Sequence, residues 1–325
     1  MYDSHVRQIS YLRISVTDRC NLRCVYCMPE SGVTWIDHTQ VLSYEEILTL
    51  ATQFASLGIE RIRLTGGEPL TRKGLPTLIG GLKKIPGIRW VGLTTNGVLL
   101  PQHLPELLNA GLDAVNISIN TLNSAQYMAM TRCDELHAAL DGLAAARQVP
   151  ALQVKVNCVP SAGNADQWAP LAALAREGSA VDVRFIELMP IGLGSFLSQV
   201  QERDVLHQLQ NTFGTPLPCP QDEGGGPGRY VTFPGFSGRV GFISAISHQF
   251  CDRCNRVRLT ATGTLKLCLQ YESNLDLRVL LRGGADERVI STAIERAIYQ
   301  KPACHHFGTV NMQGDEPSNM NQIGG

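Results

Sequence analysis

Two groups of three cysteines have spacings that are typical of metal or cluster ligands. The first is a C-x3-C-x2-C run formed by Cys20, Cys24 and Cys27, with no fourth cysteine nearby. Three thiolates can hold three corners of a cubane iron–sulfur cluster and leave the fourth iron open to a substrate or cofactor. The alternative is a structural zinc site, which would need a fourth ligand such as His5 or His38.

The second group, Cys251, Cys254 and Cys268, repeats the three-ligand arrangement near the other end of the chain. Taken alone, its spacing is compatible with a second cluster that has an open iron. It is equally compatible with half of a zinc ribbon, completed by another cysteine or by His305 or His306. The remaining cysteines have no ligand spacing and are interpreted as buried or surface thiols: Cys133, Cys158, Cys219 and Cys304.

Composition limits the classes of function. The 325 residues suffice for one large domain and a smaller one. A net charge of -1 argues against a general nucleic-acid or membrane surface. The N-terminus has no apolar signal segment, and no apolar run approaches the length of a membrane span. We therefore expect a cytoplasmic protein, in which clustered cysteines are ligands rather than disulfides.

Short β-type runs alternate with helical patterns from residue 11 to about residue 210. The predicted strands are Leu12–Val16, Arg61–Leu64, Trp90–Thr94, Ala114–Ile119, Gln153–Val159 and Val181–Glu187. The predicted helices lie near 43–57, 74–84, 103–110, 136–147, 166–177 and 201–210. Six such units predict an α/β fold with a parallel sheet and right-handed crossovers. Because a closed barrel of this type has eight units, we expect an open, partial (β/α)6 barrel of the TIM type.

The predicted strands carry cations on one face. Apolar residues alternate with Arg13, Arg63, Lys155 and Arg184, so these four side chains share the face opposite to the one that packs on helices. Burying arginine and lysine without counter-charge is costly, which predicts a cavity filled by an anionic ligand. The alternative is a sheet with one solvated face, which is uncommon when helices cover a parallel sheet.

The pattern changes after residue 215, where proline- and glycine-rich segments mark a boundary. We predict a barrel region at 1–218 and a C-terminal α+β region at 219–325 that covers the open side of the barrel. Its expected elements are strands at Arg229–Phe233 and Arg239–Ile246 and a helix at about 286–300.

The first cysteine run, with Tyr26 before its last cysteine, resembles the radical S-adenosylmethionine (SAM) superfamily. The run Gly66-Gly67-Glu68-Pro69 after the second strand supports this. Within the superfamily, the whole chain is similar to the GTP-cyclising family of molybdenum cofactor synthesis. The segments that carry this resemblance are Thr94–Gly97, Phe185–Pro190, the second cysteine group with Asn255–Arg258, and the closing Gly324-Gly325.

The resemblance implies two [4Fe–4S] clusters. The first would bind SAM and yield a 5′-deoxyadenosyl radical, and the second would hold the guanine base of GTP at its open iron. The residues that it implies as SAM contacts are Tyr26, Gly67, Ser118 and Met189. Glycine also permits close approach of the backbone to a ligand.

The resemblance also implies a triphosphate site. The chain has no G-x4-G-K-[ST] run, so this site is not a P-loop. Arginine binds phosphate through two hydrogen bonds, which fits the inward cations. The implied GTP contacts are Arg13, Arg63, Thr94, Lys155, Arg256, Val257 and Arg258, to which strand phase adds Arg184.

The implied reaction removes the 3′ hydrogen of GTP and joins C3′ to guanine C8. The product would be (8S)-3′,8-cyclo-7,8-dihydroguanosine 5′-triphosphate, which passes to cyclic pyranopterin monophosphate synthase. The resemblance further implies a low-potential electron donor, a C-terminal tail that reaches the active site, and a homodimer. Two other interpretations stay open: a radical SAM enzyme with an auxiliary cluster that modifies a peptide, and a non-catalytic zinc-binding protein. The peptide-modifying enzyme gives no reason for the inward cations.

Overall fold

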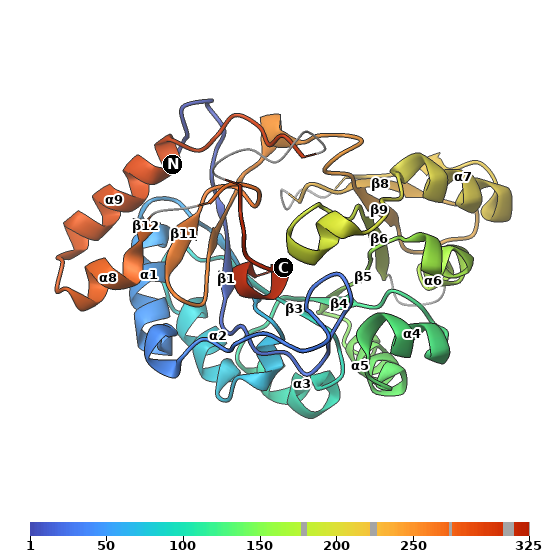
Figure 1. Ribbon diagram of the computed structural model, residues 1–325, viewed down its shortest axis with the longest axis horizontal. Coiled ribbons are helices and arrows are strands. Elements are labelled where there is room, and N and C mark those ends of the chain that lie inside the picture. Colours follow the sequence, from blue (N-terminus) through green and yellow to red (C-terminus); the bar gives the residue numbers. More distant parts are fainter. Residues whose placement is uncertain (177–180, 222–225, 273–274, 308–314, 325) are drawn as a thin grey trace.

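Six parallel strands form the centre of the fold, as the sequence predicts. In the computed structural model, which describes residues 1–176, 181–221, 226–272, 275–307 and 315–324, they lie side by side in chain order (Figure 1). Every end of these strands lies within one residue of the predicted end. The strands are β1 (Tyr11–Ser15), β2 (Arg61–Thr65), β3 (Trp90–Thr95), β4 (Ala114–Ser118), β5 (Gln153–Cys158) and β6 (Asp182–Ile186).

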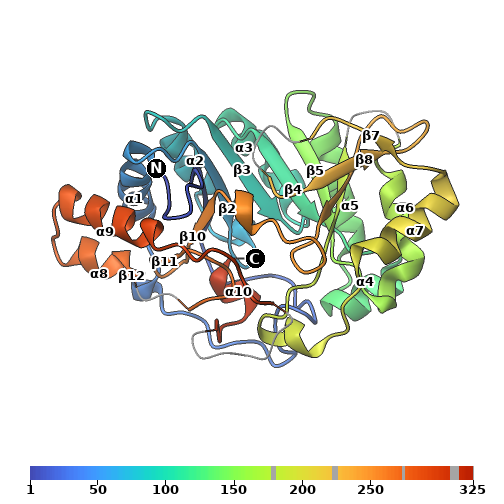
Figure 2. The same cartoon turned by 90° about the horizontal axis from the view of Figure 1, so that it is seen from above.

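Helices cover the outer face of these strands (Figures 1 and 2). The predicted helices are confirmed as α1 (Tyr44–Ser56), α2 (Leu75–Lys83), α3 (Leu100–Asn109), α5 (Leu136–Arg147), α6 (Trp168–Ala173) and α7 (Glu202–Phe213). The expected end of the fifth helix, residue 177, lies outside the described residues. Short 3₁₀ turns connect several elements: η1 (His38–Gln40), η2 (Pro69–Thr71), η3 (Ala162–Gln167), η4 (Gly192–Phe196) and η5 (Cys251–Arg253).

One helix, α4 (Ser124–Thr131), is absent from the sequence prediction. It buries only Tyr127 and Thr131 among its residues, so it lacks the apolar period that identifies a helix in sequence. Its start is nevertheless marked, because the Asn123 side chain accepts a hydrogen bond from the backbone N–H of Gln126 at 3.0 Å.

The C-terminal third of the chain extends both edges of the same sheet. At one edge, β10 (Arg256–Leu259) pairs in parallel with β1, followed by antiparallel β11 (Thr264–Lys266) and β12 (Leu275–Asp276). At the other edge, β9 (Val240–Ile243) pairs in parallel with β6, followed by antiparallel β8 (Arg229–Thr232) and β7 (Leu217–Pro218). Across the described residues the sheet has twelve strands in an open order from β12 to β7.

The predicted boundary at 218/219 falls between β7 and β8, which pair with each other. The two predicted regions therefore share one sheet, and the division of the chain between them stays a prediction. Both added parallel strands come from the second region, so the curved sheet has eight parallel strands in its middle, β10, β1 to β6 and β9. This is the strand number of a closed barrel, here kept open.

The core lies between the sheet and its helices. The outward residues of β1 and β2, including Leu12, Ile14 and Ile62, are fully buried there. A capping box starts α1, since Ser43 Oγ accepts from Glu46 N at 3.1 Å and Glu46 accepts from Ser43 N at 2.7 Å. Alternation of apolar and polar residues therefore fixes which face of each strand meets the helices.

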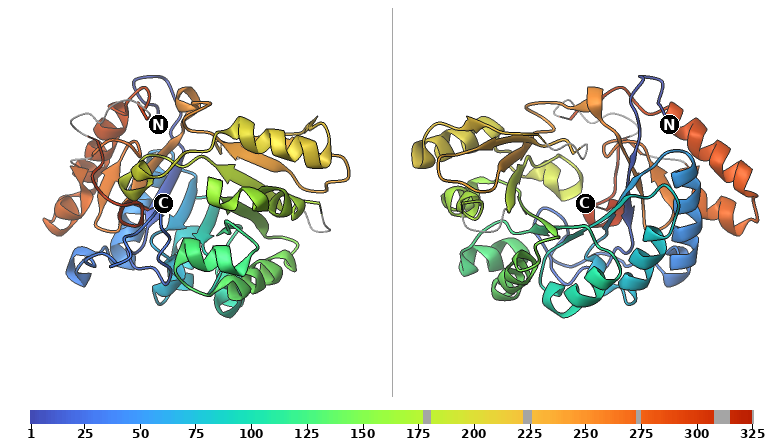
Figure 3. Two further views of the ribbon diagram at one scale, coloured as in Figure 1. Left: turned by 45° about the vertical axis from the view of Figure 1, so that its right-hand side comes forward. Right: turned by 180° about the vertical axis from the view of Figure 1, so that it is seen from behind.

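The last helices lie on two sides of the molecule. α8 (Leu277–Arg282) and α9 (Glu287–Tyr299) pack beside α1, where Arg282 pairs with Glu46 at 2.6 Å. The short α10 (Met320–Ile323) lies over the middle of the curved sheet, close to the C-terminus (Figures 2 and 3). None of the helices in the described parts of the chain is long and apolar enough to cross a membrane.

Candidate active site

The two cysteine groups lie at opposite ends of one cavity. Cys20, Cys24 and Cys27 follow the carboxyl end of β1. β10 runs parallel to β1, with Arg256 opposite Tyr11, so Cys254 lies just before the amino ends of the strands. All six cysteines of the two groups line a cavity of about 760 Å³ that extends along the concave face of the sheet.

The chemistry of these side chains fits iron–sulfur clusters. All six are free thiols, and thiolate is the usual ligand of such clusters. Burial raises the pKa of Cys20 to about 12 and that of Cys24 to about 11. Burial also acts on Cys254, but Arg256 and Lys301 outweigh it and lower the pKa of this thiol to about 7. Within the described residues, no three His, Cys, Asp or Glu side chains are grouped as ligands of a single metal ion.

The four expected SAM contacts, Tyr26, Gly67, Ser118 and Met189, all line the cavity. The Tyr26 hydroxyl accepts a hydrogen bond from Asn120 Nδ2 at 2.9 Å. A Cβ on Gly67 would lie 2.3 Å from the carbonyl oxygen of Arg19. The glycine is therefore required for packing against the segment that leads into the first cysteine group, whatever it contacts in a ligand.

Glu68 connects the ends of β2 and β3 beneath the first cysteine group. Its carboxylate accepts hydrogen bonds from the Thr95 hydroxyl at 2.7 Å, Asn96 N at 2.7 Å and Leu70 N at 3.0 Å. Burial raises its pKa to about 7 in spite of these three donors. The glutamate of the glycine-rich turn thus holds the segments after β2 and β3 together at the end of the cavity where the first cysteine group lies.

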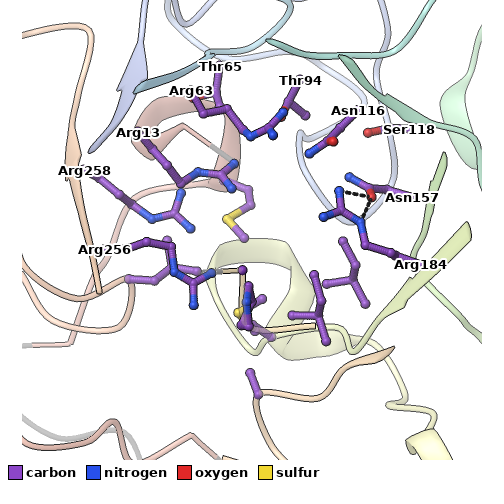
Figure 4. Close-up of a pocket in the computed structure, with 18 of the residues that line it drawn as sticks. Arg13, Arg63, Thr65, Thr94, Asn116, Ser118, Asn157, Arg184, Arg256 and Arg258 are labelled. Carbon is purple, nitrogen blue, oxygen red and sulfur yellow. Dashed lines mark hydrogen bonds between the residues drawn. The ribbon is translucent and has the colours of Figure 1, made fainter. Parts of the chain in front are cut away.

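Guanidinium groups gather in the cavity: Arg13, Arg63, Arg256 and Arg258 lie on one side, and Arg184 lies on the opposite side (Figure 4). Arg13 is the register partner of both Arg63 and Arg258, which places three cationic side chains on adjacent strands. Burial lowers the pKa of Arg13 well below its ordinary value, and the nearby Arg258 adds to the effect. Burial and Arg256 likewise lower the pKa of Arg258 to about 10. Positive charges this close together repel one another, so an anion between them would be strongly favoured.

The polar residues of the cavity wall form layers along the strands. Thr94, Asn116 and Lys155 are register partners on β3, β4 and β5, and all three line the cavity. Lys155 Nζ contacts the Tyr230 hydroxyl at 3.2 Å and the Asp182 carboxylate at 3.6 Å.

The next layer toward the first cysteine group contains Ser118, Asn157 and Arg184. Arg184 donates two hydrogen bonds to Asn157 Oδ1, at 2.9 and 2.6 Å (Figure 4). All predicted GTP contacts, including Val257, line the same cavity. Their positions match the prediction, and their roles stay predictions.

Several cavity residues were not predicted from the sequence: Tyr11, Trp90, Lys266 and Lys301. Strand phase could have found Tyr11, because it lies two residues before Arg13 on the same face. Its hydroxyl accepts from Arg63 Nε at 2.7 Å. The two lysines lie outside the predicted strands, so strand alternation gave no signal for them. Of the four cysteines without ligand spacing, Cys158 is buried and Cys304 is exposed.

Arg7 ties the N-terminus to the second cysteine group, an arrangement that we call the Arg7 clamp. The clamp consists of Arg7, the Asp3 carboxylate at 2.6 Å, and the carbonyls of Cys251 at 2.6 Å, Pro302 at 2.7 Å and Ala303 at 2.7 Å. Both side chains of the ion pair are nearly inaccessible to solvent. A guanidinium with this many acceptors fixes three distant segments relative to one another.

The C-terminal tail enters the cavity region. The Gly324 carbonyl accepts a hydrogen bond from Arg258 Nη1. Gly324 has φ of 77°, and a Cβ there would lie 3.0 Å from Ser15 Cβ and from Thr65 Oγ1. Only glycine fits this position without strain. The other predicted tail residue, Gly325, lies outside the described residues.

The open sheet, with a three-cysteine run after its first strand, defines a radical SAM-type protein. The family model of the radical SAM superfamily matches residues 14–164, and the model described as Molybdenum Cofactor Synthesis C matches residues 181–307. A solved structure of Streptococcus suis SuiB bound to S-adenosylmethionine shares the fold, with a TM-score of 0.61 and 13% identity over 88% of this chain and 68% of that one.

Curated relatives are more specific. GTP 3′,8-cyclase of Heliobacterium modesticaldum is 46% identical over the full length of both chains. The enzyme of the same name from Pelotomaculum thermopropionicum is 44% identical, again over both full lengths. Human molybdenum cofactor biosynthesis protein 1 is 42% identical over 93% of this chain and 48% of its own length. The chain belongs to the GTP 3′,8-cyclase family.

Proposed function

We propose that this chain catalyses the radical cyclisation of GTP to (8S)-3′,8-cyclo-7,8-dihydroguanosine 5′-triphosphate, the first step of molybdenum cofactor biosynthesis. The reaction forms a carbon–carbon bond and belongs to the lyase class. The observation that carries the proposal is the single cavity with a thiol group at each end and a concentration of guanidinium groups between them. A triphosphate is the natural ligand for such a charge pattern.

The cysteines would hold a [4Fe–4S] cluster at each end of the cavity. When bound, SAM at the first cluster supplies a 5′-deoxyadenosyl radical. Tyr26, Gly67, Ser118 and Met189 would orient SAM at this end, and the walls of the cavity would exclude water from the radical. The second cysteine group would place the guanine base at the other end.

The chain's cations would bind the triphosphate, with Arg13, Arg63, Arg256 and Arg258 on adjacent strands. Held between the two ends, the ribose of GTP would lie beside the SAM site. Its 3′ hydrogen is removed, C3′ then bonds to guanine C8, and one electron and one proton complete the product. We propose cyclic pyranopterin monophosphate synthase as the enzyme that consumes this product, and a low-potential electron donor as a further partner.

An anaerobic turnover assay tests the proposal. The protein is reconstituted with iron and sulfide, given SAM and a reductant, and 5′-deoxyadenosine is measured with and without GTP. We expect GTP-dependent 5′-deoxyadenosine and a product with the mass of GTP. SAM cleavage at the same rate with and without GTP would support the radical chemistry but refute GTP as the substrate, and would favour a peptide-modifying enzyme. Absence of cleavage by protein that holds both clusters would favour a binding protein.

A further inference from the structure

Asn116 lies halfway along the cavity and has an unsatisfied polar atom. It follows the inward phase of β4, and its carboxamide points into the cavity from the same wall as Thr94 and Ser118 (Figure 4). The residue is only 4% exposed. Its Oδ1 atom has no hydrogen-bond partner within the part of the chain that the structure describes.

A buried acceptor without a partner is unusual and costs stability. The wall around Asn116 is rich in donors, yet the neighbouring Lys155 is already engaged by Tyr230 and Asp182. The Thr94 hydroxyl on the adjacent strand also has no partner within the described residues. These two orphan groups therefore form a polar spot that a ligand's hydrogen-bond donor would satisfy.

The strand register fixes the height of this spot. Asn116 lies two residues, roughly 7 Å, before Ser118 along β4, and Ser118 is the one nearer to the first cysteine group. It lies the same distance after Ala114, which is level with Gly92 and Arg63 in the strand register. The spot therefore lies between Ser118, a proposed SAM contact, and the level of Arg13, Arg63 and Arg258, which would bind the triphosphate.

We propose that Asn116 is a specificity residue that holds the ribose of the nucleotide substrate, its carboxamide oxygen accepting a hydrogen bond from a ribose hydroxyl. Phosphate oxygens are acceptors and cannot satisfy Oδ1, while the base is assigned to the second cysteine group. The ribose has hydroxyl donors, and its C3′ must reach the layer next to SAM for hydrogen removal. The assignment rests on the proposed function and names a contact that sets sugar selectivity.

Binding measurements without turnover test this role. Equilibrium dialysis under anaerobic conditions without reductant would use wild type, Asn116→Ala and the similarly sized Asn116→Leu. The probes are GTP, 2′-deoxy-GTP, 3′-deoxy-GTP and inosine triphosphate. Wild type should bind one of the deoxynucleotides about ten- to a hundredfold more weakly than GTP, because that analogue leaves the buried acceptor unpaired.

In both Asn116 variants this discrimination should fall to near unity. The affinities for GTP and inosine triphosphate should decrease by the same factor, since both keep the ribose. The deoxynucleotide that wild type binds more weakly than GTP, and that the variants do not, identifies the ribose hydroxyl that Asn116 contacts. SAM affinity and iron content serve as controls for folding.

GTP binding with the same discrimination in the variants as in wild type would overturn this assignment and leave the proposed function intact. The same holds if wild type fails to discriminate, or if only SAM affinity falls in the variants. A wild-type protein that binds no GTP would overturn the proposed function and, with it, the role of Asn116.

Discussion

The Arg7 clamp makes a strong stability prediction, because the structure offers a matched control. In Arg7→Met, the Asp3 carboxylate loses its ion partner, while 0% of the Asp3 side chain and 5% of the Arg7 side chain are exposed. Removing one partner of a buried ion pair costs about 3–5 kcal/mol, because the other charge stays buried without a counter-charge or solvent. The control is Arg203→Met, whose pair with Asp204 is 3.8 Å long and has side chains 80% and 53% exposed. An exposed pair is worth at most about 1 kcal/mol.

The assay is urea unfolding of both variants, followed by circular dichroism under anaerobic conditions. We expect the free energy of unfolding to fall by several kcal/mol in Arg7→Met and to change little in Arg203→Met. Adding Asp3→Asn to Arg7→Met removes the stranded charge and should recover part of the loss, a non-additive effect. Equal destabilisation by the two single variants would refute the clamp argument.

The clamp also predicts a local effect on the second cysteine group. Arg7 holds the backbone carbonyl of Cys251 and the segment at Ala303. Without it, Cys251 is no longer fixed relative to Cys254 and Cys268, so the proposed second cluster should be lost before the first. Iron content should fall toward half of the wild-type value, and SAM binding should persist. Full iron content in Arg7→Met would show that the second group forms without the clamp.

Three further predictions concern the cavity. Arg258→Ala should weaken GTP binding by about ten- to a hundredfold and leave SAM affinity unchanged in equilibrium dialysis; wild-type GTP affinity would contradict the role of Arg258. Gly324→Ala should suppress product formation with both clusters intact, because the new Cβ meets Ser15 and Thr65 at 3.0 Å; unchanged turnover would show that the tail is dispensable. Burial raises the pKa of Glu68 in the folded chain to about 7, from an ordinary value of 4.5. The unfolded chain therefore releases this proton at lower pH than the folded chain, and Glu68 should lower stability as pH rises through 5 to 7. Glu68→Gln should change the slope of unfolding free energy by up to about 1.4 kcal/mol per pH unit, measured by urea unfolding over pH 5–8; parallel slopes would refute it.

The central barrel could be predicted from the sequence because its information is local. Alternation along strands of five or six residues is sufficient to separate helix-facing residues from inward ones, and Arg13, Arg63, Lys155 and Arg184 all line the cavity as expected. The start of α1 is likewise set by a local pair, because Ser43 and Glu46 are three residues apart and cap each other's backbone N–H groups. Local chemistry of this kind needs no knowledge of the rest of the fold.

Contacts between distant parts of the chain could not be predicted in this way. β10 has four residues and pairs with β1, which lies more than two hundred residues earlier in the chain. The contact of Arg7 with Cys251 spans a separation of 244 residues. The orphan oxygen of Asn116 is likewise a property of its surroundings, since the strand pattern gives its direction and says nothing of its partners.

The placement of β10 beside β1 is what turns two cysteine motifs into one site. Because both strands run in the same direction, the residues after β1 and those before β10 lie at opposite ends of the sheet. An antiparallel β10 would have put both cysteine groups at the same end. The parallel pairing also brings Arg256 and Arg258 level with Tyr11 and Arg13. A single long-range strand pairing therefore sets the separation of the two thiol groups and completes the cationic wall between them.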